Sequence, residues 1–368
     1  MYIITLVGAR PQFVKAAALS AAFRENDIQE TIVHSGQHYD YEMSQLFFDQ
    51  LGIPAPKMHL DVPKAGQEVQ LAHIVERFSE ILRAEKPTAV AVYGDTTTTL
   101  GGALAAYYTR TPLIHVESGL RSYNMAMPEE MNRRLTDGLS SILFTPAAST
   151  AEILARENIH HHPDHSPSAD TPHIIAVGDI MLDNLRRASH RDVQFDFSLP
   201  EKFALVTMHR QGNTDDPNRL KAIFESMTRW AEKQQITYVF PIHPRTAKAL
   251  SGQPKLDQQL RNSPHWKIIP PVGFHEMVAL QRKASFAVSD SGGLPKEMYF
   301  HGKPTLIMRS ETEWVELLDV RAAQLVEPTV ASLDKAFANV VLNPEFDPSI
   351  YGDGTAAQKI VNHLKRVW

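Results

Sequence analysis

The sequence predicts an α/β protein made of two Rossmann-like domains. Short runs of β-branched and apolar residues recur along the chain, and a longer segment with helical spacing usually follows each run. This alternation is typical of parallel sheets that are covered by helices on both faces. It occurs as two series within 368 residues, a length that exceeds what one core ordinarily holds. A closed barrel of eight β/α units is the alternative, and the two separate series disfavour it.

The individual elements follow from these runs in chain order. In the first half, β-branched stretches predict strands at residues 2–7, 30–34, 89–93 and 113–117. In the second half, they predict strands at residues 203–208, 236–241, 267–269, 286–289 and 305–308. Apolar residues at helical spacing predict helices at residues 11–24, 69–85, 100–110 and 356–367.

A polar stretch separates the two series. Residues 158–172 are rich in His, Pro, Asp and Ser and have no apolar period, which predicts a loop at the domain boundary. We therefore expect an N-terminal domain of residues 1–170 and a C-terminal domain of residues 171–355. Adjacent histidines in such a segment lack the framework that fixes metal-ligand geometry, so we expect a solvated loop and no metal site. The histidines concerned are His160, His161, His162, His165 and His173.

Composition excludes several classes of protein. The formal net charge of -5 offers no broad basic surface for nucleic acid. The absence of cysteine excludes disulfides, thiolate catalysis and cysteine-based metal sites. No apolar run approaches the ~20 residues of a membrane-spanning helix, and the N-terminus lacks the basic region of a signal peptide. The sequence therefore predicts a soluble cytoplasmic protein that binds neither nucleic acid nor membrane.

Candidate ligand-binding residues follow the first predicted strand. Ligands of open α/β sheets bind beyond the carboxyl ends of the strands. There the segment from Gly8 to Lys15 places Arg10 and Lys15 at the start of a helix, where cations and backbone amides can hold an anion. The segment is neither a Walker loop nor a dinucleotide-binding glycine fingerprint.

Three carboxylates are expected to meet at the same edge. Asp95 ends one predicted strand and Glu117 ends the next, while Glu129 lies in the loop that follows. Neighbouring parallel strands would bring these groups close together, and paired carboxylates suit general acid and base catalysis. Taken alone, Asp95 could equally be the N-cap of the helix that follows it.

The second half repeats this arrangement. His209 and Arg210 end its first strand, and His243 ends the next. The segment Ser289–Asp290–Ser291–Gly292–Gly293 could cradle phosphates, and Glu297 could accept hydrogen bonds from ribose hydroxyls. An ordinary glycine-rich turn and a structural histidine are the alternative interpretations.

Together these segments resemble the non-hydrolysing UDP-N-acetylglucosamine 2-epimerase family. The resemblance spans nearly the whole chain, with its motifs in the expected order. These motifs are 8–11 (GARP), 36–38 (GQH), 94–96 (GDT), 117–121 (ESGLR), 128–133 (PEEMNR), 209–210 (HR), 290–293 (DSGG) and 313–316 (EWVE).

The resemblance implies a GT-B-like fold with a ligand cleft between the two domains and with the C-terminal helix, residues 356–368, crossing back to the first domain. It implies an isomerase without cofactor or metal that removes the C2 proton, eliminates UDP to give a glycal and adds UDP back after reprotonation. A homodimer is also expected. The implied catalytic residues are Asp95, Glu117, Glu129 and His209. The implied UDP-sugar ligands are Arg10, Lys15, His243, Val272, Met277, Ser291, Gly292, Gly293 and Glu297.

Departures from the family pattern concern the substrate. Trp314 stands where many members have Arg, Met277 where an aromatic residue is common near the uracil, and residues 211–213 and Pro295 also differ. The opening segment and residues 312–316 resemble a branch that includes epimerases of UDP-2,3-diacetamido-2,3-dideoxyglucuronate. The first expectation is that the protein converts UDP-N-acetylglucosamine to UDP-N-acetylmannosamine. The alternative is that its substrate is UDP-2,3-diacetamido-2,3-dideoxyglucuronate. A GT-B glycosyltransferase, a hydrolysing epimerase and a non-catalytic UDP-sugar sensor are further alternatives.

Overall fold

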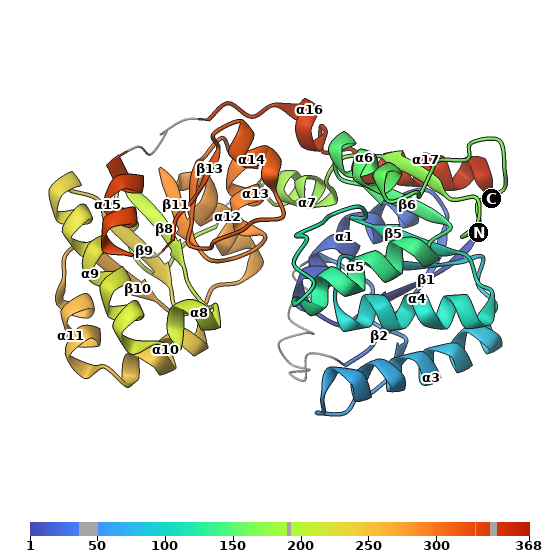
Figure 1. Cartoon of the computed structure of the whole chain (residues 1–368), viewed down its shortest axis with the longest axis horizontal. Helices are drawn as coiled ribbons and strands as arrows, with labels where there is room; N and C mark the ends of the chain where they lie inside the picture. Colours follow the sequence, from blue (N-terminus) through green and yellow to red (C-terminus); the bar gives the residue numbers. More distant parts are fainter. Residues whose placement is uncertain (37–50, 190–192, 328, 339–343) are drawn as a thin grey trace. The chain divides into compact units, whose positions relative to one another are not determined.

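The computed structural model describes residues 1–36, 51–189, 193–327, 329–338 and 344–368. The chain forms two compact units, each with its own parallel sheet (Figure 1). Unit 1 contains Met1–Arg187 and Asp347–Trp368, and unit 2 contains Ala188–Phe346. The motif residues Gln37 and His38 lie outside the described residues.

Unit 1 is built on a parallel sheet with strand order β3-β2-β1-β4-β5-β6-β7. Its central strands are continuous apolar runs that are buried on both faces, as parallel sheets require. The strands are β1 (Tyr2–Val7), β2 (Gln29–His34), β3 (Met58–His59), β4 (Ala89–Tyr93), β5 (Leu113–Val116), β6 (Ile142–Thr145) and β7 (His173–Ala176). The helices are α1 (Arg10–Glu25), α3 (Gln67–Glu85), α4 (Thr97–Thr109), α5 (Pro128–Leu139), α6 (Ala148–Arg156), α7 (Ile180–Ser189, ending in unit 2), α16 (Pro348–Tyr351) and α17 (Ala356–Val367).

Unit 2 repeats the design with strand order β10-β9-β8-β11-β12-β13, again all parallel. Its strands are β8 (Phe203–Thr207), β9 (Thr237–Pro241), β10 (Trp266–Ile269), β11 (Phe286–Ser289), β12 (Thr305–Ile307) and β13 (Ala323–Leu325). The helices are α8 (Gln211–Thr214), α9 (Pro217–Gln234), α10 (Pro244–Ser251), α11 (Pro254–Asn262), α12 (Phe274–Lys283), α13 (Leu294–Phe300), α14 (Val315–Asp319) and α15 (Val330–Ala338).

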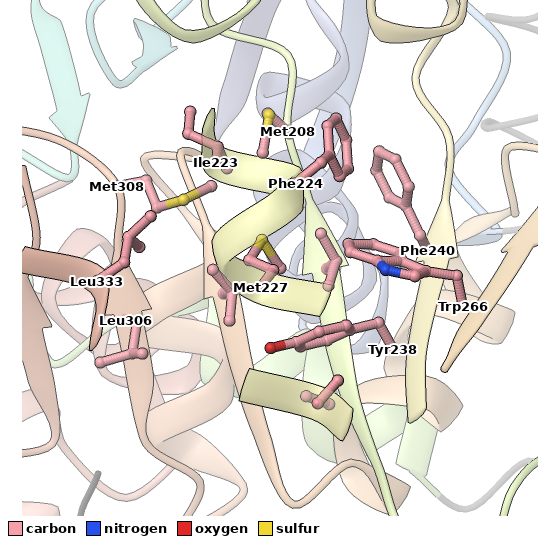
Figure 2. Close-up of a cluster of buried hydrophobic side chains, with 14 of the residues drawn as sticks. Met208, Ile223, Phe224, Met227, Tyr238, Phe240, Trp266, Leu306, Met308 and Leu333 are labelled. Carbon is pink, nitrogen blue, oxygen red and sulfur yellow. The ribbon is translucent and has the colours of Figure 1, made fainter. Parts of the chain in front are cut away.

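A large aromatic and aliphatic cluster forms one core of unit 2 (Figure 2). Side chains of α9 meet those of the sheet there, with Phe224 and Trp266 in edge-to-face contact at 5.2 Å. Met208 and Met308 belong to this cluster and are almost completely buried. Because each of them directly precedes a polar residue at a strand end, the core fixes where His209 and Arg309 leave the sheet.

The two predicted series of strands are confirmed, but the structure divides the chain later than residue 170. β7 pairs in register with β6, so residues 171–187 belong to unit 1. Residues 347–355 also belong to unit 1, and so does α17, which Figure 1 shows in red beside the rest of that unit. The polar loop therefore connects two elements of one unit, because the strand after it completes that unit's sheet.

Helix α4 begins earlier than residue 100. The Thr96 hydroxyl accepts a hydrogen bond from the Thr99 amide at 3.3 Å and caps the helix, so the run of threonines forms its first turn. The alternative interpretation of Asp95 as the N-cap is wrong, because Asp95 precedes the capping residue Thr96.

The histidines around residues 160–173 do not share one environment. His160, His161 and His165 are exposed, as a solvated loop predicts, whereas His173 lies on β7 and is buried. Its Nδ1 lies 3.2 Å from Nε2 of His363 on α17. Within the described residues, no group of three or more potential ligands is placed to hold a metal ion. No helix in the described part of the chain is long and apolar enough to cross a membrane.

Candidate active site

The loops at the carboxyl ends of β1 and β4 are tied together by one buried side chain. Gln12 accepts hydrogen bonds from the amides of Gly8 and Ala9 at 2.8 and 3.1 Å, and its Nε2 donates to the Tyr93 carbonyl at 3.1 Å. Gly8 is required because a Cβ there would collide with the hydroxyls of Ser35 and Thr98. Arg10 opens α1, and its side chain lies outside the described part of the structure.

Asp95 leaves the end of β4 and is held by helix α5. Arg133 donates to Asp95 Oδ2 through Nη2 at 2.6 Å and through Nε at 3.0 Å. Asn132 donates to the Asp95 main-chain carbonyl at 2.8 Å. The carboxylate remains about one-third exposed. A fixed carboxylate that still reaches solvent can accept a proton from a bound substrate or hold a hydroxyl.

Glu117 leaves the end of β5 in a left-handed conformation, with φ +68°. This conformation is rare for a residue other than glycine and marks a position that its surroundings enforce. Glu117 forms an ion pair with Lys15 of α1, and both side chains are largely buried. Lys15, which was predicted to bind an anionic ligand, is therefore paired with Glu117, a predicted catalytic carboxylate.

Glu129 and Glu130 are neighbours on the first turn of α5 with different environments. Glu130 is completely buried; it accepts hydrogen bonds from the Ser122 amide at 2.7 Å and from Arg133 at 3.1 Å. Burial opposes ionisation of Glu130, but the bonds to Ser122, Arg134 and Arg133 outweigh it and lower its pKa. Glu129 is half-buried, and no described residue bonds its carboxylate. The Glu129 carboxylate is therefore available to react with a ligand, whereas Glu130 holds the loop at Ser122 in place.

In unit 2, Asp290 organises the end of β8. Its buried carboxylate accepts hydrogen bonds from the amides of His209 at 3.0 Å and Arg210 at 2.9 Å, and from Nδ2 of Asn213 at 3.1 Å. Nδ1 of His209 lies 3.2 Å from the same carboxylate, so the other ring nitrogen remains for a ligand. Burial lowers the pKa of His209 and outweighs the attraction of Asp290, while Arg210 and Arg245 lower it further.

Two arginines approach the glycine turn that follows β11. A Cβ built on Gly292 would lie 3.6 Å from Nη2 of Arg210 and 3.7 Å from Nη1 of Arg309. Nε of Arg210 is buried without a hydrogen-bond partner among the described residues. Glu313 Oε1 also lies 3.6 Å from that Cβ position and Glu313 pairs with Arg309, so Arg210 beside the two glycines is the cation that best suits a diphosphate.

Trp314 also supports this turn. Its Nε1 donates to the Gly292 carbonyl at 2.8 Å, and Lys296 Nζ lies 3.8 Å from the centre of its ring. The residue that departs from the family pattern therefore fixes the conformation of the turn, with a cation–π contact behind it.

The remaining predicted ligands of unit 2 lie along the same edge of its sheet. Glu297 of α13 is half-buried and accepts a hydrogen bond from Gln281 at 2.6 Å. His243 caps α10, and its ring centre lies 5.3 Å from that of His209. Val272 and Met277 are partly buried and pack against a core cluster of unit 2.

The structure thus groups the predicted residues by unit and adds partners that sequence reasoning missed. Asp95, Glu117, Glu129 and Lys15 belong to unit 1, whereas His209, His243, Ser291–Gly293 and Glu297 belong to unit 2. Gln12, Arg133 and Arg309 were not singled out. The rule that ligands bind beyond strand ends would have found Arg309, two residues after β12. No local signal marks Arg133 as the partner of Asp95, because 38 residues separate them.

Comparison with known proteins identifies the family. A sequence model of the family described as UDP-N-acetylglucosamine 2-epimerase matches residues 21–365. The chain is 38% identical over the full length of both chains to UDP-2,3-diacetamido-2,3-dideoxy-D-glucuronate 2-epimerase of Pseudomonas aeruginosa. It is 34% identical to UDP-N-acetylglucosamine 2-epimerase of Methanocaldococcus jannaschii, over 99% of each chain.

Solved structures agree with this identification. The crystal structure of the Methanocaldococcus jannaschii UDP-GlcNAc 2-epimerase in complex with UDP-GlcNAc and UDP matches with a TM-score of 0.84 at 32% identity, covering 100% of both chains. The predicted GT-B-like α/β class is therefore confirmed. On the strength of the family match and of these full-length relatives, the chain belongs to the UDP-N-acetylglucosamine 2-epimerase family.

Proposed function

We propose that this protein inverts C2 of a UDP-linked N-acetylated sugar without net hydrolysis. In the proposed reaction, a carboxylate takes the proton from C2 and the C1–O bond breaks, so that UDP leaves with the bonding electron pair and a C1–C2 double bond forms. Reprotonation of C2 on the opposite face and return of UDP to C1 give the epimer. The observation that carries the proposal is the pair of strand-end carboxylates, Asp95 and Glu117, each ion-paired with a buried or half-buried cation.

The residues of unit 1 are proposed to act on the sugar. Asp95, Glu117 and Glu129 supply the general acid and base functions, since all three arise from two adjacent strand ends and the helix that holds Asp95. Arg10 and Lys15 supply positive charge at the same sheet edge, with Lys15 acting through Glu117.

The residues of unit 2 are proposed to hold UDP. Ser291, Gly292 and Gly293 would receive the diphosphate, with Arg210 and His209 facing its charge. Glu297 would accept the ribose hydroxyls. Val272 and Met277 would lie beside the uracil, with His243 near His209.

UDP-N-acetylglucosamine is the first candidate substrate, as its use by the family implies. A second candidate is UDP-2,3-diacetamido-2,3-dideoxyglucuronate, because the relative named for it shares 38% of its residues with this chain. Trp314, which holds the Gly292 carbonyl, also belongs to a segment that resembles that branch.

We also propose that the protein is a homodimer. Adjacent helices α4 and α5 expose large apolar side chains, namely Tyr107, Tyr108, Met131 and Leu135. Exposed apolar side chains that gather on neighbouring helices mark a candidate protein interface. Sedimentation equilibrium should give a dimer for the native chain and a monomer for Leu135→Glu, whereas a monomeric native chain would contradict the proposal.

The test of the catalytic proposal is proton NMR of the protein with each UDP-sugar in deuterium oxide. We expect deuterium at C2 together with the manno epimer. The UDP-sugar that is epimerised faster shows whether the protein acts on UDP-N-acetylglucosamine or on the diacetamido uronate. Free UDP and free N-acetylmannosamine accumulating with turnover would indicate a hydrolysing epimerase. UDP binding without exchange in either sugar would contradict epimerisation and favour a transferase or a sensor.

A further inference from the structure

A buried ion network lies directly beneath the two strand ends that carry Asp95 and Glu117. His115 of β5 is completely buried; its Nδ1 lies 2.7 Å from Oδ1 of Asp137, and its Nε2 lies 2.8 Å from the Gly94 carbonyl. Oδ2 of Asp137 accepts a hydrogen bond from Nη1 of Arg121 at 2.7 Å.

Both ring nitrogens of His115 face atoms that only accept hydrogen bonds. The Gly94 oxygen is a carbonyl, so Nε2 must donate to it. Oδ2 of Asp137 accepts hydrogen bonds from the Arg121 guanidinium at 2.7 Å and from the Gly119 amide at 3.3 Å, and these donors favour the carboxylate form of this buried side chain. Nδ1 must therefore donate as well, and the ring carries a proton on each nitrogen.

Charge balance supports this protonation state. Arg121 also binds the Glu157 carboxylate through Nε at 3.0 Å and Nη2 at 2.7 Å. Arg134 links Glu157 to Glu130, and Arg133 links Glu130 to Asp95, so with a protonated ring the connected network contains four cations and four anions. With a neutral ring, the completely buried Asp137 carboxylate would share Arg121 with Glu157 as its ion-pair partner among the described residues, and incompletely balanced buried charge is costly.

The network reaches both catalytic loops. His115 holds the carbonyl of Gly94, whose φ of +64° turns the chain toward Asp95. Asp137 accepts a hydrogen bond from the Gly119 amide at 3.3 Å, and so holds the turn that Glu117 enters with φ +68°. An enforced left-handed conformation at Glu117 needs such fixed surroundings.

We propose that His115 is a positioning residue: a buried imidazolium that, together with Asp137, fixes the Gly94–Asp95 and Glu117–Gly119 turns relative to each other. The expected effect of His115 on catalysis rests on the proposed function. The protonation state of His115 is independent of that function and can be measured without substrate.

The first experiment is nitrogen-15 NMR of the native protein labelled at histidine. We expect one buried histidine with protons on both ring nitrogens at pH 7.5, and its signals should be absent from His115→Phe. A single-proton tautomer for His115 would overturn the proposal whatever the enzyme catalyses.

The second experiment measures C2 deuterium exchange by His115→Phe. We expect kcat to fall about 100-fold, the scale of a misplacement of about 1 Å. KM and the Kd for UDP should stay within about twofold, because the proposed UDP ligands lie in unit 2. The matched control is Phe78→Leu, which loosens the unit 1 core on α3 without touching the network.

The outcomes are distinguishable. If Phe78→Leu has a similar Tm to His115→Phe but keeps its kcat, the loss reflects positioning rather than general instability. Equal losses of kcat in both variants, or an unchanged kcat in a folded His115→Phe, would contradict the positioning role. No exchange by the native protein would overturn the proposed function and leave the NMR result to decide the charge of His115.

Discussion

At the scale of single residues, the candidate acids and bases differ in the cations that hold them. Asp95 is bound by Arg133 and Glu117 by Lys15, so both carboxylates are held in fixed positions. Glu129 is bonded by no described residue, although its neighbour Glu130 is fully engaged. Adjacent carboxylates on one helix turn therefore have separable roles.

We predict that Glu129→Gln and Glu130→Gln give opposite results. Glu129→Gln should lower C2 exchange by about 10²- to 10⁴-fold, the usual worth of an acid or base, with little change in Tm. Glu130→Gln should lose about 1–3 kcal/mol of unfolding free energy, because buried donors lose their charged acceptor. Exchange kinetics and urea unfolding of both variants check this. A stable, fully active Glu129→Gln would remove Glu129 from the chemistry.

We predict that UDP binding draws a proton onto His209. The ring is neutral at pH 7 because burial lowers its pKa, while an anionic diphosphate beside it would raise that pKa again. The affinity for UDP should therefore rise as pH falls from 8 to 6. Calorimetry in buffers of different ionisation enthalpy should show greater proton uptake by the native protein than by His209→Gln. Equal uptake would mean that His209 does not face the diphosphate.

At the scale of elements, the site depends on how tightly the strand-end loops approach each other. Gln12 joins the β1 and β4 loops, and Ser35 and Thr98 join the β2 end to α4 with hydroxyls 2.8 Å apart. Gly8 lies against both hydroxyls, so the spacing of these elements leaves no room for a side chain.

We predict that Gly8→Ala destabilises the protein by about 1–3 kcal/mol and lowers activity, because overpacking must push the β1 loop away from Ser35 and Thr98. The matched control is Gly138→Ala in α5, where an added methyl group meets no atom within 4 Å. That change should stabilise the protein by about 0.5–1 kcal/mol, as alanine does in helices. Thermal unfolding and exchange rates test the pair; a Gly8→Ala variant as stable as the native protein would contradict the predicted clash.

At the scale of the whole molecule, the last segment of the chain completes the first unit. His363 of α17 meets His173 of β7, and Nη2 of Arg366 lies 2.8 Å from Nδ1 of His363. Arginine can only donate, so Nε2–H of His363 donates to His173, whose own Nε2–H donates to the His165 carbonyl. Protonating His363 on Nδ1 would therefore break its hydrogen bond with Arg366.

We predict that acid weakens unit 1 through His363. Burial, followed by Arg366, His173 and His161, lowers its pKa from 6.5 to about 4. Between these values the unfolded chain binds more protons, so this stability is fully present above pH 6.5 and is lost as pH falls toward 4. The shift corresponds to about 3 kcal/mol. Urea unfolding of His363→Gln should show a shallower loss between pH 7 and 4.5 than the native protein, and equal slopes would contradict this assignment.

Much of this organisation could be read from the sequence. The strands could be predicted because fully buried parallel strands are continuous apolar runs, as at residues 89–93. Polar residues at the ends of those runs, such as Asp95, Glu117 and His209, predict a candidate site because ligands of such sheets bind there. The ordered motifs indicated the family, which the full-length match confirms.

Tertiary structure alone decided how those residues are paired. Asp95 meets Arg133, Lys15 meets Glu117 across 102 residues, and Asp290 orients His209 across 81 residues. It also decided that β7 belongs to unit 1, since only strand pairing shows which sheet a short strand joins. Local sequence determines secondary-structure propensity and the pattern of buried residues. Ion-pair partners and the sheet that a strand joins depend on contacts between residues that are far apart in the sequence.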